Sequence, residues 1–179
     1  DYLGERGLDP VPTIEHFGVG YCGNAGSPLY GRLTFPVQID ATEVITIVGR
    51  VLPNNPSAEL GIGEPKYWHY PFSKNSCVYH LYNAQNSIAE SGWVVVTEGI
   101  FDVMGFYAAK IYPAVALLGT SFSGIQATML AHYCTKFLLA FDNDASGRKA
   151  TLATANLARQ FNYRPCLLPL PPQWKDVGE

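Results

Sequence analysis

Apolar and polar positions follow a regular alternation in the second half of this chain. Short apolar runs predict strands, and the longer stretches between them predict helices of roughly 10 to 15 residues. Runs that are apolar throughout are typical of strands buried on both faces of a parallel sheet, and their alternation with helices indicates βαβ units. The predicted strands are 93–97, 114–118, 136–141 and 163–168, and the predicted helices are about 100–110, 123–133 and 146–160.

The first half has shorter and more broken elements. The pattern predicts a helical turn at 2–7, a short helix at 13–17 that Thr13 caps, and strands at 31–39 and 43–51. A Pro-, Asn- and Gly-rich loop is expected at 52–65, followed by an irregular aromatic segment at 67–82. The change of pattern places a domain boundary near residues 88–92, which gives domains at 1–91 and 92–179.

Composition fits a folded protein of one domain or two small ones. The chain has 179 residues, of which 47% are hydrophobic and 15% charged, and no apolar stretch approaches the roughly 18 residues that cross a bilayer. It begins with Asp1 rather than Met, so we expect a piece of a longer protein. The four cysteines are scattered without a C-x-x-C pair, which argues against zinc and against a disulfide framework and favours a reducing, cytoplasmic setting.

Net charge argues against a broad nucleic-acid-binding face. The formal charge is −3, and residues 1–91 contain five Lys or Arg against nine Asp or Glu. Residues 92–179 contain seven against six. Any contact with nucleic acid therefore depends on a few placed cations and on metal ions.

Acidic residues follow two of the predicted strands. Glu98 comes directly after the run 93–97, and Asp142 and Asp144 come directly after the run 137–141. Because ligands of parallel sheets bind beyond the carboxyl ends of the strands, these side chains are expected to share a site, and unpaired carboxylates suit Mg²⁺. Structural roles remain open, since Glu98 and Asp102 can interact with a helix dipole and Asp144 or Ser146 can cap a helix.

Other polar and aromatic residues are less specific. Arg50, Lys66 and Lys74 are isolated cations that ordinarily lie on a solvated surface. An aromatic group can stack on bases, although packing against the sheet is favoured; its members are Tyr67, Trp68, Tyr70, Phe72 and Tyr79.

Motifs in the second half resemble the Toprim module of bacterial and phage primases. Glu98-Gly-Ile-Phe-Asp102-Val is similar to E-G-Y-M-D-V, and Leu117-Leu-Gly-Thr-Ser121 is similar to S-L-G-T-S/A. The stretch from Phe141 to Lys149 is similar to Y/F-D-G-D-x-A-G-R-x. The fold implied is α/β: a Toprim-type parallel sheet flanked by helices, preceded by a smaller mixed α+β subdomain.

Motifs in the first half extend the resemblance over the whole chain. They match Y-L-x-x-R-G-L, F-x-I-G-Y/F, R-x-M-F-P, G-R-V-L, P-K-Y, F-x-K and L-Y-G-L-Y-E of the primases, in that order. The matching segments are Tyr2 to Leu8, Phe17 to Tyr21, Gly31 to Pro36, Gly49 to Leu52, Pro65 to Tyr67, Phe72 to Lys74 and Val78 to Asn83.

The resemblance implies a DNA-dependent RNA primase core. It implies catalysis by Glu98, Asp142 and Asp144, with two or more Mg²⁺ or Mn²⁺ ions held by these residues together with Asp102 and Asp176. Contacts to phosphates of NTP or nucleic acid fall to Arg50, Lys66 and Lys74, with Arg6 as a weaker candidate. The implied partners are a single-stranded DNA template, NTPs and an RNA primer, with a replicative helicase docking through regions outside this chain. No zinc and no membrane contact are expected, and the implied location is the cytoplasm of a bacterial cell or phage-infected host.

One departure from the family pattern and two alternatives remain. The family often has a second acid two residues after the position of Asp176, where this chain has Gly178. The first alternative is another Toprim activity, either nucleolytic or topoisomerase-like. The second is a non-catalytic module that binds nucleotide or single strands.

Overall fold

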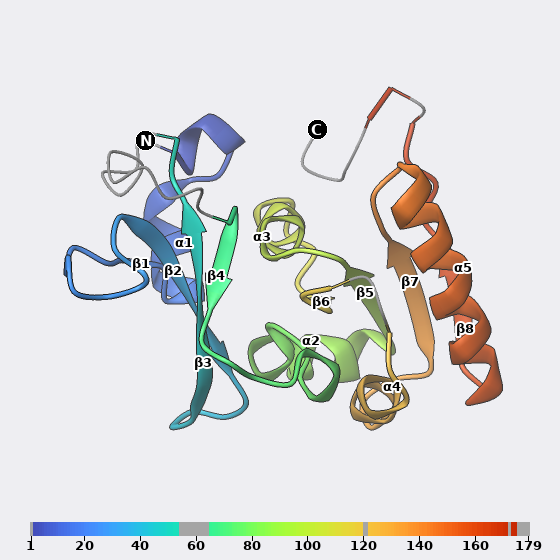
Figure 1. Cartoon of the computed structure of the whole chain (residues 1–179). Coiled ribbons are helices and arrows are strands. Elements are labelled where there is room, and N and C mark those ends of the chain that lie inside the picture. Colours follow the sequence, from blue (N-terminus) through green and yellow to red (C-terminus); the bar gives the residue numbers. More distant parts are fainter. Residues whose placement is uncertain (1, 54–64, 120–121, 172, 175–179) are drawn as a thin grey trace. The chain divides into compact units, whose positions relative to one another are not determined.

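The structure, a computed structural model, describes residues 2–53, 65–119, 122–171 and 173–174. The chain forms two compact units, Asp1–Phe72 and Ser73–Glu179, each with a four-stranded sheet (Figure 1). This division lies earlier in the chain than the boundary predicted between residues 91 and 92. Residues 73–91 belong to the second unit because α2 (Leu81–Ser91) packs against its sheet.

The first unit is built on an antiparallel sheet with the strand order β1-β2-β3-β4. Its strands are β1 (Gly20–Tyr21), β2 (Arg32–Gln38), β3 (Val44–Val51) and β4 (Tyr67–His69). The predicted strands 31–39 and 43–51 correspond to β2 and β3, and Asp40 closes the turn between them by accepting hydrogen bonds from the N–H groups of Thr42 and Glu43. Most of the predicted loop 52–65 falls outside the described residues.

The N-terminal helices of the first unit are η1 (Gly4–Arg6) and α1 (Pro10–Phe17). The prediction that Thr13 caps the second helix was wrong. Asp9 is the N-cap, its side chain accepts from the N–H of Val11, and Pro10 occupies the first helical position, where its missing N–H costs nothing. Thr13 lies inside the helix and is buried, and Gly18 ends the helix with a φ of 61°.

The second unit is built on a parallel sheet with the strand order β6-β5-β7-β8. The strands are β5 (Trp93–Thr97), β6 (Ala114–Ala116), β7 (Lys136–Ala140) and β8 (Arg164–Leu167). Between them run α3 (Ile100–Ala108), α4 (Gly124–Ala131) and α5 (Ala145–Gln160). The predicted mixed fold and parallel sheet are confirmed, with β5 at its predicted bounds.

Four elements before β5 were not predicted, namely β1, β4, η3 (Lys74–Ser76) and α2, and β4 lies in the segment 67–82 that was expected to be irregular. Leu81, Ala84 and Ile88 of α2 are buried at helical spacing, and Gly92 ends the helix in the left-handed conformation, its N–H bonding the Ile88 carbonyl at 2.9 Å. His80 precedes the helix, and its Nδ1 lies 2.9 Å from the carbonyl oxygen of Ala114, the first residue of β6. A carbonyl only accepts hydrogen bonds, so this ring nitrogen carries the proton.

Both faces of the parallel sheet are covered. Alternate strand residues share one core cluster with buried residues of α2, α4 and α5, including Val94, Val96, Val115, Phe137 and Leu139. The intervening residues face the other way, where the right-handed β5-α3-β6 crossover places α3 (Figure 1). None of the described helices has the length and apolar character that a membrane span needs.

Candidate functional site

Glu98 and Asp142 meet at the carboxyl ends of two adjacent strands. β5 ends one residue before Glu98, and β7 ends two residues before Asp142. The backbone N–H of Asp142 donates to Oε1 of Glu98 at 3.3 Å, although 44 positions separate the two residues in the sequence. The sheet therefore brings these two predicted site residues together.

This meeting point is a topological switch point of the sheet. From β5 the chain crosses to β6 on one side, whereas β7 and β8 lie on the other side. The loops that leave β5 and β7 therefore lead to helices on opposite faces of the sheet, and the ligands of open α/β sheets commonly bind where the strand order reverses in this way.

The electrostatics of Glu98 indicate a carboxyl group that is costly to ionise in the folded chain. Burial raises the pKa of the Glu98 carboxyl above its ordinary value, and the carboxylate of Asp142 raises this pKa further. The hydrogen bond from the Asp142 N–H acts in the opposite direction, and the carboxylate of Asp144 adds a smaller upward effect. A bound cation would relieve this repulsion.

Asp144 and Asp102 both have structural roles at helix N-termini. Oδ1 of Asp144, the N-cap of α5, accepts from the N–H of Gly147 at 2.8 Å, which confirms the capping role considered for it. Oδ2 of Asp102 accepts from the N–H of Gly99 at 2.9 Å at the start of α3. A carboxylate has two oxygens with several lone pairs, so a capping hydrogen bond does not by itself prevent metal binding.

Gly147 is required where the turn after β7 enters α5. A Cβ atom at this position would lie 2.1 Å from the carbonyl oxygen of Asp142. This is far inside van der Waals contact with backbone, so any side chain would push the Asp142 loop away from Glu98.

The donor set fits a hard divalent cation. Glu98 and Asp142 offer carboxylate oxygens on adjacent strand ends, and Mg²⁺ is commonly held by one or two carboxylates together with substrate phosphates. Across the described ranges, no three acidic, histidine or cysteine side chains are grouped closely enough to hold a metal ion by themselves. Asp176 lies outside the described residues, as do Thr120, Ser121 and Gly178.

Lys74 belongs to the second unit and is placed by α4. Gln126 is completely buried, and its Nε2 donates to the carbonyl oxygens of Lys74 and Cys77, both at 2.9 Å. Ser123, the N-cap of α4, donates through its hydroxyl to the carbonyl of Asn75 at 2.6 Å. α4 follows β6, so its N-terminus lies at the carboxyl end of the sheet, the end at which Glu98 and Asp142 meet.

Arg50 lies in the first unit, on β3, with a half-buried guanidinium. Its Nε and Nη1 are buried without a hydrogen-bond partner among the described residues. Its Cζ lies 5.0 Å from the ring centroid of Tyr67 and 6.0 Å from that of Tyr2. A buried cation with unused donors is a ready site for an anion such as phosphate.

The other predicted cations and aromatic residues are more dispersed. Lys66 and Arg6 are exposed, and Arg6 lies over the ring of Tyr2 at 5.0 Å. Trp68 packs edge-on against Tyr70 with ring centroids 4.8 Å apart, whereas Tyr79 is buried in the second unit. The aromatic group is therefore divided between the two units.

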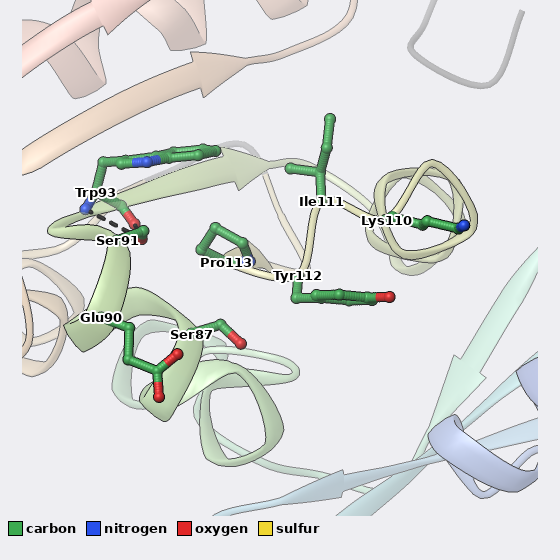
Figure 2. A pocket seen from close by; sticks show the side chains of 8 residues that line it. All are labelled: Ser87, Glu90, Ser91, Trp93, Lys110, Ile111, Tyr112 and Pro113. Atoms are coloured by element: carbon green, nitrogen blue, oxygen red, sulfur yellow. Dashed lines mark hydrogen bonds between the residues drawn. The ribbon is translucent and has the colours of Figure 1, made fainter.

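A pocket lies at the opposite end of the parallel sheet. Figure 2 shows it between the end of α2, Trp93 at the start of β5, and residues 110–113 just before β6. These residues are at the amino ends of the strands, away from the carboxylates, so the pocket is not part of the acidic site.

Three residues that hold Lys74 or the acidic turn were not predicted from the sequence. Gln126 positions the backbone of Lys74, and Asn143 and Arg148 bond to each other beside the acidic turn, with Arg148 Nη1 2.7 Å from the Asn143 carbonyl oxygen. A buried Gln three residues after a Ser was a capping-box signal for the first. Nothing in the sequence indicated the bonds made by the other two.

Comparisons with known proteins were made on the sequence and on the fold. The family described as Toprim-like matches residues 95–179. A DNA primase of Thermotoga maritima is 34% identical over 155 residues, covering 83% of this chain and 26% of that protein. A DNA primase of Aquifex aeolicus is 32% identical over 184 residues, covering 84% of this chain and 35% of that protein. The chain thus spans about a quarter to a third of the length of these relatives.

Solved structures agree with the sequence relatives. The Aquifex aeolicus primase, containing its zinc-binding and RNA polymerase domains, superposes with a TM-score of 0.86 at 25% identity, over 99% of this chain and 50% of that one. The DnaG primase catalytic domain bound to single-stranded DNA superposes with a TM-score of 0.80 at 27% identity, over 99% of this chain and 64% of that one.

Proposed function

We propose that this chain, a relative of the bacterial DNA primases with a Toprim-like domain and the fold of their catalytic core, makes RNA primers on single-stranded DNA. The observation that carries this proposal is the pairing of Glu98 with Asp142 across the carboxyl ends of β5 and β7. The superposition on a primase domain bound to single-stranded DNA supports the choice of template.

The acidic residues are assigned to metal binding. Glu98, Asp142 and Asp144 would hold Mg²⁺ or Mn²⁺ and act as the catalytic acids, assisted by Asp102 and Asp176. The ions would supply Lewis-acid stabilisation of the charge that develops on the attacking and leaving oxygens of nucleotidyl transfer. The raised pKa of Glu98 and the mutual repulsion of these carboxylates support this assignment.

The cations are assigned to phosphates. Arg50, with its unused guanidinium donors, would bind a phosphate of NTP or of the nucleic-acid backbone. Lys74, whose backbone Gln126 holds in place, would do the same from the second unit, and exposed Lys66 would contribute a weaker contact. The protein then positions the substrates and neutralises the charge of their phosphates, which needs no nucleophilic side chain.

The same similarity to primases suggests partners for the longer protein. They are a single-stranded DNA template, NTPs, an RNA primer and a replicative helicase, the last of which would dock through regions outside this chain. We place the protein in the cytoplasm of a bacterial cell or of a phage-infected host.

Incorporation of labelled NTP on single-stranded DNA tests the proposal. The assay supplies an annealed RNA primer and Mg²⁺ or Mn²⁺, and compares the unsubstituted chain with Asp142→Ala. Loss of a metal-coordinating charge should lower incorporation by about a thousandfold. Glu90→Ala, which removes an exposed acid from α2 in the same unit, is the matched control and should leave incorporation unchanged.

Two other outcomes would assign a different function. Metal-dependent cleavage of the template, lost in Asp142→Ala, would identify a Toprim nuclease. Binding of NTP and single-stranded DNA with no incorporation, both by this chain and by the chain joined to the zinc-binding and helical domains of a related primase, would identify a non-catalytic binding module.

A further inference from the structure

Asn143 stands between the two acids of the turn after β7 and bonds to two separate parts of the second unit. Its side-chain Nδ2 donates to the carbonyl oxygens of Pro171 at 3.4 Å and Trp174 at 3.3 Å, beyond β8. Its Oδ1 lies 3.3 Å from Nη1 of Arg148 in α5, and the same nitrogen donates to the Asn143 backbone carbonyl at 2.7 Å.

The chemistry of these partners fixes the orientation of the Asn143 amide. Arg148 has only donors, so it must face the amide oxygen, and the two carbonyls have only lone pairs, so they must face the amide nitrogen. The reversed orientation would lose all three side-chain bonds. The amide is therefore a directional link between the first turn of α5 and the segment after β8.

The segment that Asn143 holds is also tied at its other end. The N–H of Leu168 donates to the carbonyl of Leu139 in β7 at 2.9 Å, and the N–H of Trp174 donates to the carbonyl of Pro171 at 2.9 Å. The described residues of this segment, 168–171 and 173–174, are thus held beside β7 at the start and beside the acidic turn at the end. In the sequence this segment leads directly to Lys175 and Asp176.

We propose that Asn143 is a positioning residue that fixes the Asp142–Asp144 turn against the segment after β8, and thereby sets the geometry in which the acids bind divalent metal. This inference rests on the proposed function, because that proposal supplies the metal. The positioning itself is argued from the hydrogen bonds of Asn143.

Asn143→Leu tests the link, because it removes the amide without adding charge. The backbone amides of Leu168, Leu170, Gln173 and Trp174 should then exchange with deuterium about tenfold faster, as measured by mass spectrometry. The dissociation constant for Mn²⁺, measured from the electron paramagnetic resonance signal of free Mn²⁺, should rise about tenfold because the turn loses its fixed position.

Asn143→Asp tests the bonds to Pro171 and Trp174 separately from the bond to Arg148. An aspartate can still accept from Arg148 but cannot donate to the carbonyls of Pro171 and Trp174. Exchange in residues 168–174 should therefore rise as it does in Asn143→Leu. Asn156→Leu is the matched control, since Asn156 is exposed on the same helix and accepts only from Arg159; both readouts should stay unchanged.

The outcomes distinguish failure of the link from failure of the proposed function. Unchanged exchange in both Asn143 variants would overturn the link, whatever the metal does. Faster exchange with an unchanged dissociation constant for Mn²⁺ would show that Asn143 has only a structural role. It would overturn the positioning claim. If the unsubstituted chain did not bind Mn²⁺ at all, the metal assignment of the proposed function would fail, and this inference with it.

Discussion

The two sheets of this chain carry buried charge of opposite sign in different ways. In the antiparallel sheet of the first unit, Arg32 and Arg50 project from within strands β2 and β3. In the parallel sheet of the second unit, Glu98 and Asp142 follow the ends of β5 and β7. Arg32 is 1% exposed and donates to the carbonyls of Gly49 and Pro65, whereas Arg50 keeps two buried nitrogens without a hydrogen-bond partner among the described residues.

Arg32 therefore has a structural role, whereas Arg50 is the charge that we propose binds phosphate. A charge on a strand is partly covered by neighbouring side chains, so it donates to carbonyl oxygens, as Arg32 does, or keeps donors that an anion could use, as Arg50 does. Charges at the carboxyl ends of parallel strands are gathered by the topology itself and face a crevice. The second arrangement can be predicted from sequence, and the first cannot.

The largest expected effect comes from a substitution that distorts the acidic end of the parallel sheet. Gly147→Ala should displace the Asp142 carbonyl, abolish incorporation of NTP and destabilise the fold by about 3 kcal/mol. Gly105→Ala in α3 is the matched control, because a Cβ there meets nothing within 4 Å, and it should stabilise by about 0.5 kcal/mol. Denaturant unfolding of both variants measures their free energies of unfolding. Similar values would show that the structure relieves the contact at Gly147 with little loss of stability.

A second variant tests the positioning of Lys74. Gln126→Met leaves the carbonyls of Lys74 and Cys77 without their donor, which should cost about 2 kcal/mol and lower Tm by about 5 °C. KM for NTP should rise with a smaller change in kcat. Gln85→Met, which removes one partly exposed bond to the Tyr133 hydroxyl, should change Tm by less than half as much; an equal change would argue against the Gln126 link.

A third variant sharpens the contrast between the two arginines. Arg50→Met removes a half-buried charge with unused donors, so Tm should stay level or rise while KM for NTP, or the Kd for single-stranded DNA, rises about tenfold. Arg32→Met removes the donor of two hydrogen bonds and should lower Tm. A fall in Tm for both variants, with unchanged binding, would make Arg50 structural as well.

The smallest expected effect concerns pH. The pKa of Glu98 is raised in the folded chain, so its contribution to stability is present below the ordinary glutamate pKa and is lost as the pH rises through the raised value. Without divalent metal, Glu98→Gln should therefore be slightly more stable than the unsubstituted chain at pH 7 to 8 and equal to it near pH 4. Thermal unfolding across this range tests it, and Mg²⁺ should stabilise only the unsubstituted chain.

Much of the second unit was predictable because its signals are local. Each strand of the parallel sheet is a short apolar run, and the acids follow two of those runs directly, so residues 93–97 gave β5 at its observed bounds and gave the position of Glu98. Glu98 and Asp142 were expected to lie together because parallel strands end at one edge of the sheet. Their hydrogen bond bears out that expectation.

The parts that were missed depend on tertiary contacts. α2 has only Leu81, Ala84 and Ile88 as its buried stripe among polar residues, and the segment before it is aromatic, which obscured the helical spacing. Thr13 was taken for the N-cap although the local signal favoured Asp9, since Asp is a better N-cap than Thr and Pro10 suits the first helical position. The link through Asn143 joins residues 28 and 31 positions apart, and no local pattern encodes such a contact.

β8 has a consequence for handling this chain. It is the last strand of the parallel sheet, and its outer edge has no neighbour among the described strands, whereas the β6 edge is joined by Tyr79 through an antiparallel bridge to Ala116. Leu167 on β8 is 53% exposed, and Arg164 is the one charged residue of the strand. Pro165 lacks the N–H that would face this edge, and a short strand with a charge and a proline resists pairing between molecules, so concentrated preparations of this chain should stay dispersed, and Pro165→Val should promote association through β8.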